Sequence, residues 1–143
     1  MKSAKSVDKT FAGFSEIEHT ADWELAVWAP DLPALLEQAA RGMYALSGTR
    51  LLSGPRQSTA LTLPYTDPER LLVSFLSELL WLGERDGLGF DLFRLEFSDK
   101  QLQAHLEGAP IAARSKEIKA VTYHNLAVRE TARGLETTIV FDV

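Results

Sequence analysis

The sequence contains no cysteine. Disulfide bridges, thiolate metal sites and a cysteine nucleophile are therefore excluded, which fits a reducing cytoplasm. No apolar run approaches the roughly 20 residues that a membrane-spanning helix requires. The first ten residues, MKSAKSVDKT, are partly basic and have no apolar stretch. They do not form a secretory signal, and we expect a flexible leader over residues 1–10.

Several patterns of enzymes and of nucleotide-binding proteins are also missing. The chain has no glycine-rich phosphate loop, no Gly-x-Ser-x-Gly and no His-x-x-x-His. Its formal net charge is −5, from 15 basic and 20 acidic side chains. Affinity for a nucleic-acid backbone comes mostly from Lys and Arg, so this balance disfavours direct RNA binding. A protein partner, a small ligand or a metal ion is favoured instead.

The 143 residues suit one domain, which we place at residues 11–143. The first expected helix begins after Asp31, a good N-cap, and its apolar stripe ends near Gly48. The second begins at Asp67-Pro68 and stops in the polar residues 83–87. Trp28 and Trp81 could belong to a docking surface, but we expect both in the core.

The remaining apolar segments alternate with period two, as strands do. They cover residues 11–17, 23–28, 58–64, 90–97, 101–107, 119–130 and 135–143. Arg133-Gly134 indicates a hairpin turn before the last strand. The pattern predicts an α+β domain in which two amphipathic helices pack on one face of a twisted, largely antiparallel sheet.

A polar segment, Glu18-His19-Thr20-Ala21-Asp22, interrupts two apolar runs. It could be a connection whose side chains bond to their own backbone. It could also place a carboxylate at the start of a strand, with His19 as a neighbour that orients it. The residues alone leave both interpretations open.

The chain end, Phe141-Asp142-Val143, is unusually apolar for a terminus, so we expect the last strand to be docked in the sheet. Asp142 then lies beside the α-carboxylate of Val143, and the two charges repel unless donors or a cation separate them. A hard cation such as Ca²⁺ takes several such oxygen ligands. The alternative is a hydrated, exposed Asp142. Lys119 could balance an acidic cluster or simply be solvated.

Three segments together resemble the archease family: EHTAD at 18–22, EIKAVTYHNLAV at 117–128 and the closing VFDV. The helix segment ERLLVSFLSELLWL at 69–82 is also similar to that family. The resemblance extends from about Phe14 to Val143.

This resemblance implies a function. Archeases are accessory proteins of tRNA splicing and RNA repair, and they promote guanylylation and turnover of an RtcB-type RNA ligase without being ligases themselves. The resemblance further implies a divalent-cation site, with calcium as the expected ion. Asp22 and Asp142 would be its ligands, Val143 a third, and His19 and Lys119 would line it. We therefore expect a non-catalytic cytoplasmic protein that meets RNA only indirectly.

Two other functions remain open. A cation held by Asp22 and Asp142 could activate water, which would make the protein a metal-dependent hydrolase. The chain could instead be a general chaperone-like binding module with a purely structural cation.

Overall fold

The computed structural model describes residues 11–17 and 23–143. The expected leader at 1–10 and the polar segment at 18–22 lie outside the described residues. No helix in the described part of the chain is long and apolar enough to cross a membrane.

Both predicted helices are confirmed. Helix α2 spans Leu32–Ser47, and its N-cap Asp31 accepts a 3.0 Å hydrogen bond from the backbone N–H of Ala34. Gly48 ends it in the left-handed conformation, with φ of 66°. Helix α3 spans Pro68–Asp86 and has the same signals, an aspartate cap before it and a left-handed glycine after it.

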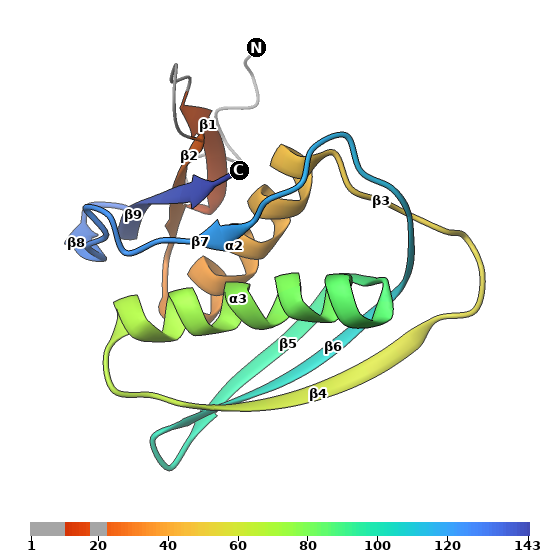
Figure 1. The fold of residues 1–143 in the computed structure, drawn as a ribbon. Coiled ribbons are helices and arrows are strands. Elements are labelled where there is room, and N and C mark those ends of the chain that lie inside the picture. The colour runs from red at the N-terminus through yellow and green to blue at the C-terminus, as the bar shows by residue number, and fades with distance from the viewer. Residues whose placement is uncertain (1–10, 18–22) are drawn as a thin grey trace.

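The strands are antiparallel throughout and divide between two sheets (Figure 1). The first, called here the β9 sheet, has the order β1-β2-β9-β7, and β8 also pairs with β9. Its strands are β1 (Gly13–Ile17), β2 (Trp23–Ala29), β7 (Ala120–Val121), β8 (Arg129–Thr131) and β9 (Gly134–Asp142). In the second, the β6 sheet, β6 pairs with all three other strands. These are β3 (Arg50–Leu51), β4 (Gln57–Pro64), β5 (Leu88–Ser98) and β6 (Gln101–Ala113).

The helices pack between these sheets. Helix α2 contacts β1 and β2, and α3 contacts β4, β5 and β7. Figure 1 shows α3 lying between the two sheets. The inner side chains of β2 and β9, such as Leu25, Ile139 and Phe141, are at most 1% exposed and join the leucines of both helices in one core. The α+β class is therefore confirmed.

One strand prediction was wrong. Residues 119–130 were expected to form a continuous strand, yet only Ala120–Val121 and Arg129–Thr131 pair in the sheet. Between them Asn125 has a positive φ of 54°, which a strand cannot accommodate. The backbone N–H of Val128 donates to the Glu69 carboxylate at 2.7 Å instead of to a strand. The hairpin before β9 is confirmed, with Thr131 opposite Gly134.

Candidate functional site at the end of the last strand

Strand β9 lies inside its sheet, with β2 on one side and β7 on the other. Its side chains alternate, so that Ile139 and Phe141 face the core while Asp142 is exposed on the opposite face. The prediction of a docked C-terminal strand is therefore confirmed. The core holds the backbone of Asp142 in place while its side chain remains accessible.

Hydrogen bonds from the segment before β9 hold the end of this strand. The backbone N–H of Lys119 donates to the carbonyl oxygen of Asp142 at 2.7 Å. Two residues earlier on β9, the carbonyl of Val140 accepts from both the N–H and the hydroxyl of Thr122, at 3.1 and 3.0 Å. Lys119 is thus beside Asp142 because their main chains are paired.

The start of β2 meets the same region from the other side. Trp23 pairs with Phe141, the residue before Asp142. The ammonium nitrogen of Lys116 lies 4.0 Å from the centre of the Trp23 ring, a cation–π contact. The fold therefore brings together the first residue of β2, the last residue of β9 and residues 116–121.

The predicted site residues fall into two groups. Asp142 and Lys119 are exposed and adjacent, and Val143 is partly buried against the core. Asp22 and His19 lie outside the described residues. Residues 11–17 and 23–143 contain no cluster of three or more histidine or acidic side chains able to hold a metal ion.

The oxygen donors at this site are of the type that a hard cation prefers, but the described residues supply too few of them. The carboxylate of Asp142 and the oxygens of Val143 are the hard donors that Ca²⁺ prefers, but Ca²⁺ takes six to eight oxygens. The described residues supply only part of such a set. Further oxygens would have to come from residues 18–22 and from water.

A small hollow of about 220 Å³ lies next to Lys119, between α3 and residues 114–121. Trp81 lines it and is 48% exposed. The guanidinium carbon of Arg85 lies 4.1 Å from the centre of the Trp81 ring. Arg85 also bonds to Asp86, and this hydrogen bond holds the pKa of the Asp86 carboxyl below its usual value.

The core position expected for Trp81 was therefore wrong, whereas Trp28 is buried as expected. The helical spacing of the sequence could have indicated that Trp81 is exposed. The apolar stripe of α3 continues from Leu79 to Leu82, both buried, and this spacing leaves position 81 outside the stripe.

Comparison with known proteins identifies the family. The model of the archease protein family matches residues 14–143. Protein archease of Methanosarcina acetivorans is 35% identical, and the match covers 91% of this chain and 95% of that protein. Protein archease of Methanopyrus kandleri is 31% identical over 89% of this chain and 97% of its own length.

Solved structures agree with this result. The crystal structure of a Thermotoga maritima protein, described as an archease and possible chaperone, matches with a TM-score of 0.68 at 25% identity, over 90% of this chain and 96% of that one. The solution structure of a Methanobacterium thermoautotrophicum protein gives the same TM-score at 21% identity and supports the fold alone. The family model matches nearly the whole described chain, and the curated relatives are up to 35% identical to it. This chain therefore belongs to the archease family.

Proposed function

We propose that this protein is a non-catalytic activator of an RtcB-type RNA ligase, which promotes guanylylation of the ligase and its repeated turnover. The observation that carries this proposal is membership of the archease family over residues 14–143. The protein would contact the ligase itself and meet RNA only through it. This agrees with a net charge of −5, which is poorly suited to binding a nucleic-acid backbone.

The proposed working site is the accessible end of β9. Asp22, Asp142 and Val143 would hold a divalent cation, with calcium as the expected ion, and His19 and Lys119 would line the site. The bound cation would supply positive charge that relieves the repulsion between the carboxylates. Support comes from the pairing of Trp23 with Phe141, which brings the start of β2 to the end of β9.

The residues at this site would act by presenting their side chains to the ligase in fixed positions. The hydrogen bond between the main chains of Lys119 and Asp142 fixes the position of the Asp142 backbone, from which its carboxylate side chain extends. Asp142 and Lys119 are both exposed, so an acidic and a basic group at the end of β9 are each open to a partner. Trp81, exposed beside Lys119, adds an aromatic contact of the kind that often dominates the binding energy of protein interfaces.

A single-turnover guanylylation assay tests this function. The ligase of the same organism is mixed with GTP and metal, with and without this protein, and the rate of ligase–GMP formation is measured. We expect strong stimulation by the wild type, and loss of stimulation in Asp22→Asn and Asp142→Asn. The protein alone should neither hydrolyse GTP nor ligate RNA.

Asp99→Asn is the matched control for these variants. Asp99 is exposed in the turn between β5 and β6, and its positive φ of 48° is one that asparagine tolerates. Loss of stimulation in Asp22→Asn and Asp142→Asn, but not in this control, would connect the activity to the end of β9. A folded wild-type protein that leaves guanylylation unchanged would refute the proposal.

A chaperone-like function is the second candidate, because the related Thermotoga maritima protein is described as a possible chaperone. In that case the protein should suppress aggregation of several unrelated unfolding proteins, which light scattering would detect. Activity confined to the ligase would exclude this general role.

A further inference from the structure

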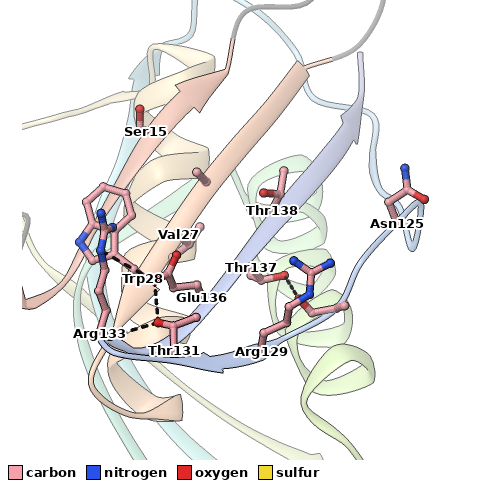
Figure 2. Close-up of a pocket in the computed structure, with 12 residues that line it drawn as sticks. Ser15, Val27, Trp28, Asn125, Arg129, Thr131, Arg133, Glu136, Thr137 and Thr138 are labelled. Carbon is pink, nitrogen blue, oxygen red and sulfur yellow. Dashed lines mark hydrogen bonds and ion pairs between the residues drawn. The ribbon is translucent and has the colours of Figure 1, made fainter.

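The outer face of the β9 sheet, opposite the helices, has an open hollow of about 440 Å³ (Figure 2). The strand register places small side chains in one row across this face and large ones in the next. The small row consists of Ser15, Ala26 and Thr138; the large row contains Trp28, Glu136 and Arg129. The hollow therefore has a floor of small residues next to a wall of large polar ones.

The wall is built around Trp28. Its indole lies over Gly13, where even a Cβ atom would come within 2.7 Å of the ring. The guanidinium carbon of Arg133 lies 4.7 Å from the centre of the Trp28 ring. The Glu136 carboxylate accepts a 2.6 Å hydrogen bond from the hydroxyl of Thr131 and lies 3.8 Å from Arg133. The negative charge of Glu136 is thus already balanced within the wall.

The charge of Arg129, in contrast, is not balanced by an ion pair within the described residues. Figure 2 shows its side chain extending from β8 toward Thr137 and Thr138. Although Glu136 is its neighbour in the register, no acidic group of the described residues forms an ion pair with Arg129. Two guanidinium groups and one carboxylate line the hollow, so it is locally positive in a chain of net charge −5.

Trp28 also carries a buried donor at this wall. Trp28 is 6% exposed, and its indole N–H has no hydrogen-bond partner. It is the only buried side-chain nitrogen or oxygen atom in the described part of the chain without a partner. A buried donor without an acceptor is destabilising. This N–H is closed off from solvent, so it responds to a ligand in the hollow through the Arg133 guanidinium stacked on its ring.

We propose that this hollow binds the phosphate group of a small phosphorylated molecule. The planar fork of Arg129 matches two phosphate oxygens and the Thr138 hydroxyl supplies a further donor, while Arg133, held by Glu136 over Trp28, adds positive charge to the same hollow. The volume exceeds that of a phosphate and falls in the range of small-molecule sites. The organic part therefore fits as well, and Glu136 can accept hydrogen bonds from its hydroxyl groups.

This site is separate from the end of β9. Thr138 precedes Asp142 by four residues on the same strand, which corresponds to about 13 Å at the rise of a β-strand. Binding here therefore does not depend on the ligase-activating function, and either proposal can fail alone.

Nitrogen-15 NMR of the full chain tests the proposal. Inorganic phosphate and glycerol 3-phosphate are titrated separately at constant ionic strength, with potassium chloride as the compensating salt. We expect saturable shifts of the Trp28 indole N–H and the Arg129 Nε–H for both compounds. The indole of Trp81 is an internal control, because it also carries a stacked arginine, Arg85, but that arginine is paired with Asp86.

Two variants complete the test. Arg129→Gln should weaken binding roughly tenfold, the effect of one lost charge-assisted contact. Arg50→Gln, a change on β3 in the other sheet, should leave affinity unchanged. Spectra that are otherwise unchanged will show that both variants are folded.

Several results would overturn the proposal. These are shifts that do not saturate, equal shifts at Trp81, or unchanged affinity in Arg129→Gln. Saturation by acetate at the same concentrations would reject the phosphate class. Binding of inorganic phosphate without glycerol 3-phosphate would reject a phosphorylated organic ligand.

Discussion

The main chain of Lys119 is hydrogen bonded to the main chain of Asp142 at 2.7 Å, while both side chains remain exposed. The backbone of these two residues therefore supports the sheet, while their side chains are free for binding. Either side chain can be changed without removing a hydrogen bond of the β9 sheet. Variants at 119 and 142 should consequently stay folded, and any loss of activity in them can be assigned to the side chain.

Calcium should stabilise the wild type through Asp142. A ligand that binds only the folded state raises its melting temperature. We expect calcium to raise the melting temperature of the wild type relative to EDTA, and Asp142→Asn to lose this increase. Without calcium the variant should differ from the wild type by no more than about 0.5 kcal/mol, as exposed substitutions usually do. Asp99→Asn should keep the full calcium response, and an equal response in Asp142→Asn would contradict the proposed ligand.

Gly108→Ala should strongly destabilise the β6 sheet. A Cβ atom at this position of β6 would lie 1.8 Å from the carbonyl oxygen of Gly89 on the paired strand β5. The backbone must move to relieve this overlap, so we expect a loss of about 1–3 kcal/mol or more in the free energy of unfolding. Gly54→Ala is the control, because nothing lies within 4 Å of a Cβ there. Urea denaturation of both variants measures the difference, and similar stabilities would contradict this account.

The Arg56–Asp91 ion pair should make stability depend on pH. The hydrogen bond from Arg56 holds the pKa of the Asp91 carboxyl below its usual value. This contribution is present above the ordinary pKa of aspartate and is lost as the pH falls through the lower folded value. Both side chains are at least 40% exposed, so solvent screens the pair and its contribution to the free energy of unfolding should be small.

The comparison of wild type with Arg56→Gln tests this effect together with the weaker 3.4 Å contact of Arg56 with Glu107, which the substitution also removes. Their free energies of unfolding in urea should differ at neutral pH and converge once Asp91 is protonated in both states. A difference that stays constant through the acid range would show that Arg56 acts by packing instead.

Glu69 should hold the segment between β7 and β8 in place. Its carboxylate accepts the backbone N–H of Val128 at 2.7 Å, and that segment has few strand pairings of its own. In Glu69→Ala the Val128 amide loses its partner, and its hydrogen exchange should accelerate at least tenfold, which corresponds to about 1.4 kcal/mol. Gln can still accept this bond, so Glu69→Gln should retain most of the protection. Equal exchange in all three proteins would contradict the role of Glu69.

The helices could be predicted because their signals are local. Asp31 and Asp67 cap the two helices, and Gly48 and Gly87 end them. The division into two sheets could not be predicted, because alternation shows which side chains share a face but not which strands pair. Residues 119–130 were misassigned for a related reason: the backbone N–H of Val128 bonds to the distant Glu69, and that of Leu126 turns back to Tyr123.

The candidate site was predictable in part. The alternation along the last strand correctly placed Asp142 on the face opposite Ile139 and Phe141. The predicted ligand Asp22 and its neighbour His19 lie outside the described residues, so their part in the site stays a prediction. The hollow around Trp28 had no sequence signal, because four strands contribute its residues and only the register brings them into adjacent rows.

The central position of β9 also affects how the chain folds during translation. β1 and β2 leave the ribosome first, and α2 can then cover their apolar face. The edge of β2 that pairs with β9 remains unpaired until both helices, the whole β6 sheet and β9 itself have been synthesised. An open strand edge is a template for pairing with other chains. A premature stop anywhere before Gly134 would therefore release a polypeptide with this edge exposed, a natural target for proteolysis.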